Sequence, residues 1–143
     1  MALPTAEHAA DSALQSIFAS VSERQLQALV LGLAHLGGWL AFHRHLSIHS
    51  ARGFPDCLLV RSRDLHHYGP PWVVFAELKT EQGRLRPEQR TWRAVLESVA
   101  HVTPAITYRL WRPSDKAAIE ALLLGPAAAQ TAGSAHYPPE ALP

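Results

Sequence analysis

Cysteine is almost absent from this chain. Its 143 residues include one cysteine, Cys57, which lies within the apolar run 57–60. A single cysteine cannot form an internal disulfide, so the sequence gives no sign of an oxidising compartment. The apolar neighbours favour a buried and unreactive thiol. We therefore expect a hydrophobic core to hold the fold, because a chain of this length can bury one without covalent cross-links.

Long apolar segments and a basic leader are missing as well. The longest apolar stretch, near residues 26–40, is interrupted by polar residues and glycines, so it is not expected to cross a bilayer. The first twenty residues contain Glu7 and Asp11 but no lysine or arginine, unlike the charged start of a signal peptide. These absences predict a cytoplasmic protein with no membrane partner.

Lysine is scarce, and arginine takes its place. Eleven of the 13 basic residues are arginines, and all 13 lie between Arg24 and Lys116. Only 9 of the 12 acidic residues lie in this central part, between Glu23 and Glu120, which gives it a net charge of +4 where the whole chain has +1. Because arginine recognises phosphate well, this distribution favours a polyanionic partner. Charge alone is equally compatible with an ordinary basic surface.

The spacing of apolar residues predicts one α/β domain with a mixed central sheet. Ser22 and Gln25 fit a capping box that opens a helix, and Gly37 with Gly38 ends it. Pro87 suits the first turn of a later helix. The predicted elements are helices over 22–36, 87–100 and 113–123, and strands over 39–46, 56–61, 72–79 and 106–111.

Each of the two longer helices is expected to bury one apolar face. The predicted buried residues are Leu26, Leu29, Val30 and Leu33 on the first helix, and Trp92, Val95, Leu96 and Val99 on the second.

The two ends of the chain differ in composition from the domain predicted for residues 22–124. Within an N-terminal extension, 1–21, a short helix over 11–21 is expected because Leu14, Ile17 and Phe18 recur at helical spacing. This helix could pack on the domain or on a second subunit, and the sequence does not distinguish the two. Residues 125–143 are rich in alanine and proline and are expected to form a disordered tail.

Two carboxylates and a lysine stand at the ends of adjacent apolar runs. Asp56 follows a tight Gly/Pro turn and precedes one run, while Glu77 and Lys79 close the next. Because side chains alternate along a strand, Glu77 and Lys79 should point to one face and Leu78 to the other. Charges in such apolar surroundings are costly unless they are paired or bind a metal. The pattern therefore predicts a site that holds a divalent metal beside a poised water.

In this order and context, Asp56, Glu77 and Lys79 resemble the active site of the PD-(D/E)xK nuclease superfamily. Four phrases resemble its virus-type replication-repair nuclease family (VRR-NUC): RGFPD at 52–56, VFAELKT at 74–80, GRLRPEQR at 83–90 and WRPSD at 111–115. The resemblance covers residues 22–124. It implies a restriction-endonuclease-like αβββαβ core with a mixed central sheet, and a stand-alone enzyme of the phage or bacterial type in a bacterial cell.

The resemblance also implies roles for individual groups. Asp56 and Glu77, together with the backbone carbonyl of Leu78, would ligate Mg²⁺ or Mn²⁺. Lys79 would orient or help deprotonate the attacking water and would offset phosphate charge.

Two further side chains match the family less distinctively. Glu23 matches a glutamate on the first helix that similar enzymes, notably archaeal-type Holliday-junction resolvases, add to the metal site. Its ordinary interpretation is an acidic residue that favours the start of a helix. Gln89 matches a family glutamine that supports Lys79 or touches the backbone.

Arginines and histidines surround the catalytic phrases. The candidates for phosphate contacts that do not depend on base sequence are Arg44, Arg52, Arg84, Arg86 and Arg90. A second set, His43, His45, His49, His66 and His67, raises the alternative of a zinc site, which the lack of a nearby cysteine disfavours. His43 or His45 could instead contact DNA.

The sequence thus predicts a Mg²⁺- or Mn²⁺-dependent endonuclease that hydrolyses phosphodiester bonds in branched DNA such as a Holliday junction, without a small-molecule cofactor. Because such a junction has two-fold symmetry, we expect a homodimer. Two alternatives stay open: a non-catalytic nucleic-acid-binding module of the same fold, and a general DNA nuclease subunit of a replication or packaging complex. The presence of Asp56, Glu77 and Lys79 together argues against the first.

Overall fold

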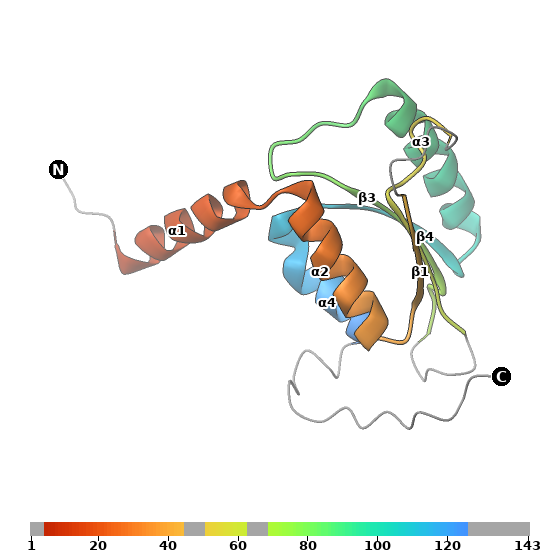
Figure 1. Cartoon of the computed structure of the whole chain (residues 1–143), viewed down its shortest axis with the longest axis horizontal. Helices are drawn as coiled ribbons and strands as arrows, with labels where there is room; N and C mark the ends of the chain where they lie inside the picture. The colour runs from red at the N-terminus through yellow and green to blue at the C-terminus, as the bar shows by residue number, and fades with distance from the viewer. Residues whose placement is uncertain (1–4, 45–50, 63–68, 126–143) are drawn as a thin grey trace.

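The computed structural model of the chain describes residues 5–44, 51–62 and 69–125. Its elements follow the order α1 (Ala6–Ser20), α2 (Glu23–Leu36), β1 (Leu40–His43), β2 (Cys57–Val60), β3 (Val73–Leu78), α3 (Pro87–Val102), β4 (Ile106–Trp111), the 3-10 helix η1 (Pro113–Asp115) and α4 (Lys116–Leu124) (Figure 1). The predicted order of helix, three strands, helix, strand and helix is confirmed. The predicted tail and the end of the first predicted strand lie outside the described residues.

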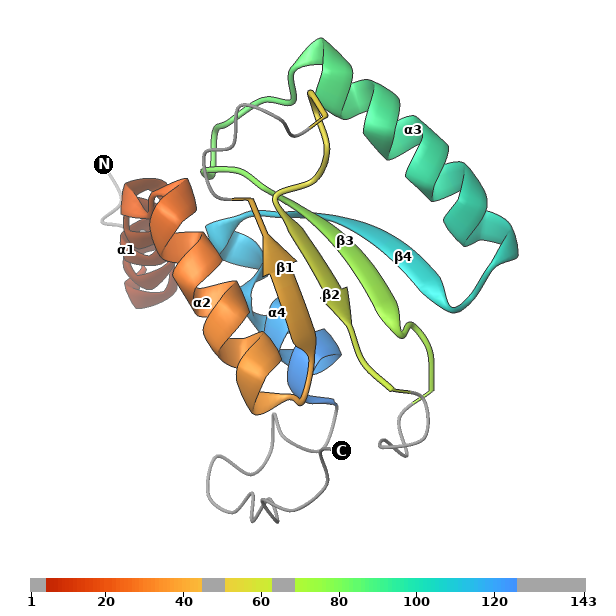
Figure 2. The same cartoon turned by 45° about the vertical axis from the view of Figure 1, so that its right-hand side comes forward.

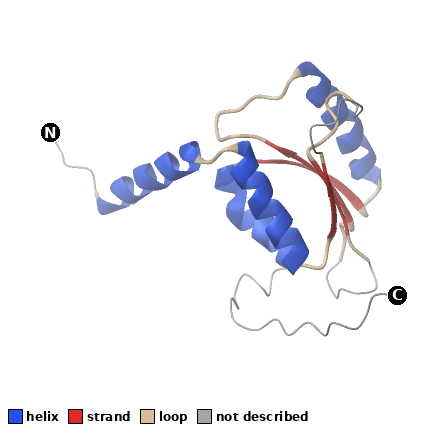
Figure 3. Cartoon of the chain, viewed as in Figure 1, coloured by secondary structure: helices blue, strands red, loops and turns tan. Residues whose placement is uncertain are grey.

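A single mixed sheet organises the domain. Its strands lie in the order β1-β2-β3-β4. The pairs β1–β2 and β2–β3 are antiparallel, whereas β3 and β4 are parallel and are connected through α3. Figure 3 shows α2 and α4 on one side of the sheet and α3 on the other. The structure is therefore of the α/β class, with a mixed sheet flanked by helices.

Helix α2 begins and ends where its sequence indicates. The Ser22 hydroxyl accepts a hydrogen bond from the Gln25 backbone N–H (3.1 Å), and the Gln25 side chain accepts one from the Ser22 N–H (2.9 Å). This reciprocal pair satisfies two of the helix's unpaired donors. At the other end, Gly37 N–H donates to Leu33 O (2.9 Å). Between these ends, the helix presents its apolar stripe to the sheet.

The hydrophobic core lies between the sheet and the pair of helices α2 and α4. Leu26 and Val30 of α2 and Ile119 and Leu123 of α4 are buried there, and each such side chain contributes about 1.5–3 kcal/mol. The sheet adds Cys57, Leu59, Val74, Ala76, Leu78 and Trp111. Burial, followed by the charges of Asp56 and Glu77, raises the pKa of the Cys57 thiol to about 12, in agreement with the predicted inert cysteine.

Close packing of α2 against α4 depends on Gly37. A Cβ at Gly37 would lie 2.0 Å from the carbonyl oxygen of Leu123, a separation that no side chain could occupy. The same carbonyl accepts a 2.9 Å hydrogen bond from the Trp39 indole N–H. Gly37 therefore permits the contact that orients Trp39 in the core.

Two apolar helix faces are not buried by the described residues. On α3 the prediction of a buried Val95 and Val99 was wrong, since their exposed fractions are 54% and 39%, whereas Leu96 is buried. The reason is that α3 packs beside β4 and only one side of its apolar stripe meets the sheet. Helix α1 begins at Ala6 rather than Asp11 and has no buried residue.

Among the described residues, no helix combines the length and the apolar character needed to cross a membrane.

Gly32 within α2 and Gly37 at its C-terminal cap offer a matched test of this packing. We expect Gly37→Ala to lower the free energy of unfolding by about 1–3 kcal/mol, because the methyl group overpacks the contact with Leu123. Gly32→Ala serves as the control, since a Cβ there meets no atom within 4 Å, and should raise stability by about 0.5–1 kcal/mol through helix propensity. Urea unfolding measures both. Equal effects of the two substitutions would contradict the packing assigned to Gly37.

Candidate active site

The turn before β2 fixes the position of Asp56. Gly53 has a φ of +79°, which favours glycine, and a Cβ there would lie 2.5 Å from the Glu88 carbonyl carbon. Phe54 packs edge-on against Phe75 of β3 (6.1 Å between ring centroids). The turn is thus pressed between the sheet and the start of α3.

Trp92 of α3 also contacts this turn. Its ring packs edge-on against Phe54 at 5.0 Å, and its indole N–H donates to the Arg52 carbonyl (3.0 Å). Arg44 adds a hydrogen bond from its guanidinium to the Phe54 carbonyl (3.1 Å). Elements that are distant in sequence therefore determine where Asp56 stands.

The Asp56 carboxylate is hydrogen-bonded to the neighbouring strand, β3. Its Oδ2 accepts a hydrogen bond from the Leu78 backbone N–H (2.8 Å). In the pairing of β2 with β3, Cys57 lies opposite Ala76. The next residues, Asp56 and Glu77, therefore lie next to each other at the end of the paired strands. The sequence-predicted carboxylates are thus brought together at one end of β2 and β3.

Glu77 and Lys79 lie side by side, as alternation along the strand predicted. Lys79 Nζ is 2.9 Å from Glu77 Oε1. The exposed fractions of the two residues are only 1% for Glu77 and 7% for Lys79. Such a buried pair is tolerated because each charge compensates the other.

Gln89 completes the contacts of Glu77. At the start of α3, its side-chain oxygen accepts a hydrogen bond from the Arg86 backbone N–H (2.8 Å), and its Nε2 donates to Glu77 Oε1. The side chain is almost fully buried at 3% exposure. Among the described contacts, Gln89 therefore supports Glu77 rather than Lys79, which the family resemblance had suggested as one of its partners.

The electrostatics of Glu77 follow from these neighbours. Its pKa is raised to about 7, chiefly by burial and next by the negative charge of Asp56, against the opposing effect of Lys79. Two carboxylates in contact repel each other when both are ionised. A cation between them would relieve that repulsion, so the donor set fits a hard divalent metal such as Mg²⁺ or Mn²⁺.

Glu23 of α2 lies beside Lys79 at the edge of the carboxylate site. Its side chain is half exposed, and Oε1 lies 3.7 Å from Lys79 Nζ. Among residues 5–44, 51–62 and 69–125, no three His, Cys, Asp or Glu side chains form a group that could hold a metal. The structure thus brings Asp56 and Glu77 together and places Glu23 next to the lysine; the predicted ligation by Glu23 and by the Leu78 carbonyl stays a prediction.

Arg112 is a functional candidate that the sequence interpretation did not identify as such. Its Nη1 donates to three carbonyls of the loop after Lys79, those of Thr80 (2.7 Å), Glu81 (3.2 Å) and Gly83 (2.8 Å). The phrase WRPSD at 111–115 was the available signal, but its partners lie about thirty residues earlier in the chain. Arg112 thus anchors the segment that links Lys79 to α3.

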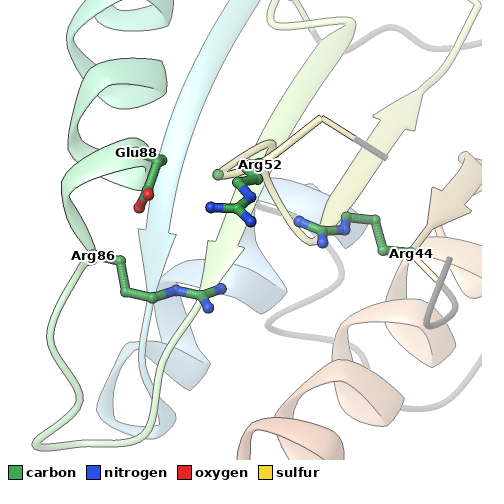
Figure 4. A pocket seen from close by; sticks show the side chains of 5 residues that line it. Arg44, Arg52, Arg86 and Glu88 are labelled. Atoms are coloured by element: carbon green, nitrogen blue, oxygen red, sulfur yellow. The ribbon is translucent and has the colours of Figure 1, made fainter. Parts of the chain in front are cut away.

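Three of the five predicted phosphate-binding arginines gather around one cavity. Arg44, Arg52 and Arg86 line a cavity of about 330 Å³ together with Gly53 and Glu88 (Figure 4). Because Gly53 begins the turn to Asp56, this basic cavity adjoins the carboxylate site along the chain. Arg84 and Arg90 are exposed and do not line it; Arg90 donates to the Leu85 carbonyl (2.9 Å).

The histidines give no zinc group in the described ranges. His43 Nδ1 lies 3.1 Å from the side-chain nitrogen of Gln27, on the inner side of α2. His45, His49, His66 and His67 lie outside the described residues.

Comparison of the chain with known protein families, with curated proteins and with solved structures finds no match in any of the three. The functional interpretation of the site therefore rests on its residues and their geometry.

Substitution of Arg112 tests its role in holding the loop. We expect Arg112→Ala to lower the free energy of unfolding by about 2 kcal/mol or more, because carbonyls that were paired with a cation lose their donor. Hydrogen exchange of the amides at 80–83 should accelerate. Arg109→Ala, which removes an exposed arginine from the preceding strand β4, is the control and should leave both measurements unchanged. Unaltered exchange in Arg112→Ala would refute the role.

Proposed function

We propose that this protein is a metal-dependent endonuclease that hydrolyses phosphodiester bonds in DNA. The observation that carries the proposal is the pair of buried residues Glu77 and Lys79 beside the half-buried Asp56. Both Lys79 and Gln89 hold the Glu77 carboxylate. A buried carboxylate whose pKa is raised, such as that of Glu77, beside a lysine and a second carboxylate is typical of binding and catalytic sites. Their order along the chain and the phrases around them support the VRR-NUC interpretation.

The side chains have distinct tasks in this proposal. Asp56 and Glu77 hold the divalent cation, and the hydrogen bond from Leu78 N–H orients Asp56 for this purpose. The chemistry that Mg²⁺ or Mn²⁺ supplies when bound is neutralisation of phosphate charge and a lower pKa of the attacking water. Lys79 adds a compact positive charge next to the reacting phosphate. Gln89 fixes the Glu77 carboxylate and acts as a positioning residue.

The arginine-lined cavity supports a nucleic-acid substrate. Arg44, Arg52 and Arg86 present guanidinium groups around it, with only Glu88 to offset them. Guanidinium groups form paired hydrogen bonds with phosphate oxygens. Contacts of this kind give affinity that depends on salt and not on base sequence. The cavity is therefore assigned to backbone phosphates that flank the bond to be cut.

We further propose a restriction-endonuclease-like core and branched DNA as the preferred substrate. Three antiparallel strands followed by a crossover helix and a parallel strand are compatible with a restriction-endonuclease-like core. Branched DNA, in particular a four-way junction, is the substrate that the family resemblance suggests. A homodimer would present two such sites to a two-fold symmetric junction.

The decisive test is cleavage of defined DNA by the wild-type protein and three site variants. Purified protein should nick four-way junctions in Mg²⁺ or Mn²⁺ and be inactive in EDTA. Asp56→Asn, Glu77→Gln and Lys79→Ala should each reduce the rate by about 100-fold or more, since each removes a charge at the reacting centre. Glu97→Gln, which makes the same chemical change at an exposed residue of α3, is the control and should cut normally.

The pattern of substrates separates the alternatives. Paired nicks on junctions alone support a resolving enzyme, and equal cutting of duplex, single-stranded and branched DNA supports a general nuclease. Binding without metal-dependent cutting would overturn the enzymatic proposal in favour of a non-catalytic module.

A further inference from the structure

Three exposed apolar side chains lie together on the sheet, and we call them the apolar strip. They are Leu40 and Phe42 on β1 and Val60 on β2, with exposed fractions of 75%, 61% and 38%. Leu40 is paired with Val60 across the two strands, and residues opposite one another share a face of the sheet. Phe42 comes two residues after Leu40, so it points to the same face. The strip thus exposes one aromatic ring beside two aliphatic side chains.

The apolar strip ends at a cation on the face opposite to α2. His43 Nδ1 is 3.1 Å from the side-chain nitrogen of Gln27 on α2, so the alternating residues Phe42 and Arg44 point to the other face. The Arg44 backbone N–H donates to the Asp56 carbonyl (3.1 Å), which extends the pairing of β1 with β2 beyond Phe42. Arg44 and Asp56 therefore follow the strip directly.

The carboxylate site lies on the same face of the sheet as the apolar strip. Phe42 is opposite Leu58, and Leu58 is opposite Phe75, so the three share one face. Glu77 follows Phe75 by two residues and points the same way. Two strand spacings of about 4.8 Å and two residues of about 3.4 Å separate Phe42 from Glu77, which places their Cα atoms about 12 Å apart. A group on the strip is therefore close to the site.

Helix α3 covers only the other half of this face. Trp92 of α3 packs on Phe54, and Phe54 packs on Phe75 of β3. Figure 2 shows α3 on the β4 side of the sheet, so the β1 side of this face has no helix over it. The described residues thus leave the apolar strip open to water beside the arginine-lined cavity, although an exposed apolar surface of this kind often marks a binding site.

An exposed ring beside arginines suits a nucleotide better than a purely apolar partner. Arg44 comes about 7 Å after Phe42 along the chain and lines the cavity together with Arg52 and Arg86. An apolar partner would leave these guanidinium groups without a counter-charge, whereas a nucleotide supplies both a phosphate and the flat face of a base. Proteins that bind single strands use this combination of cations along the backbone and aromatic side chains under the bases.

We propose that Phe42 stacks on an unpaired base next to the bond that is cut, with Leu40 and Val60 beside it on the sheet. Bases within a duplex are covered by their stacked neighbours, so only a base outside the stack can present its face to Phe42. The arginine-lined cavity holds the phosphates of the same strand. The inference rests on the proposed function and adds to it a substrate class, DNA with an unpaired nucleotide at the cleavage site. Phe42 positions the substrate and takes no part in the chemistry.

The test is the binding of two duplexes that differ in a single base. One contains an unpaired adenosine, and the other carries an abasic analogue at the same position of the same backbone. Fluorescence anisotropy in EDTA measures the affinity of the full-length protein independently of cleavage. The wild type should bind the duplex with the unpaired base at least about 10-fold more tightly, as expected for a base that stacks on an aromatic ring. Phosphate contacts do not contribute to this difference, because both duplexes offer the same phosphates.

Three variants assign the preference to Phe42. Phe42→Ala should bind both duplexes equally, because the ring is lost, and Phe42→Tyr should keep the preference, because a ring remains. Leu36→Ala is the control, since Leu36 is 72% exposed and lies outside the apolar strip, and it should behave like the wild type. Circular dichroism verifies that all variants are folded.

The other outcomes separate this inference from the proposed nuclease activity. Equal binding of the two duplexes by the wild type would overturn the stacking role, and so would a preference that survives in Phe42→Ala. Equal weakening of both duplexes in Phe42→Ala would indicate a contact that does not involve the base and would overturn it too. Cleavage by the wild type in Mg²⁺ is a separate measurement. A base preference that depends on Phe42, without metal-dependent cleavage, would support the stacking role and contradict the nuclease activity.

Discussion

The buried carboxylate of Glu77 is the constraint on which the rest of the site depends. A charge removed from water at 1% exposure is costly unless several groups compensate it. Lys79 supplies a positive charge at 2.9 Å, Gln89 donates a hydrogen bond, and Asp56 adds a repulsion that a cation would reverse. Removing any one of these neighbours would change how the charge of Glu77 is compensated. The surrounding fold must therefore hold all of them in place.

Each of these neighbours is held by contacts with a different part of the chain. Asp56 stands on a turn that Phe54 locks between the sheet and α3. Gln89 is fixed by the start of α3 through the Arg86 N–H, and the loop after Lys79 is gripped by Arg112. The supports come from β3, from α3 and from Arg112 just after β4, although the site itself contains few residues. Because separate parts of the chain hold each group, a short chain can place opposite charges together in an apolar environment.

Local patterns in the sequence were sufficient for the elements and for the pairing of Glu77 with Lys79. Alternation along β3 predicts the shared side of the strand, and the capping residues Ser22 and Gln25 predict the start of α2. The partner of Gln89 and the grip of Arg112 depend on contacts between distant segments, which no local pattern encodes. Helical spacing locates the apolar stripe of α3, yet Val95 and Val99 on it are exposed. Burial depends on which neighbouring elements cover the stripe, and the spacing does not encode that.

Direct measurement of Mn²⁺ binding tests the central claim that Asp56 and Glu77 form a two-carboxylate metal site. Titration calorimetry or electron paramagnetic resonance on the metal-free protein would compare the wild type with Glu77→Gln and Glu23→Gln. We expect binding that is lost in Glu77→Gln and retained in Glu23→Gln, because Glu23 lies next to Lys79 and is half exposed. Binding that is unaffected by Glu77→Gln would contradict the account, and so would a wild-type protein that binds no Mn²⁺.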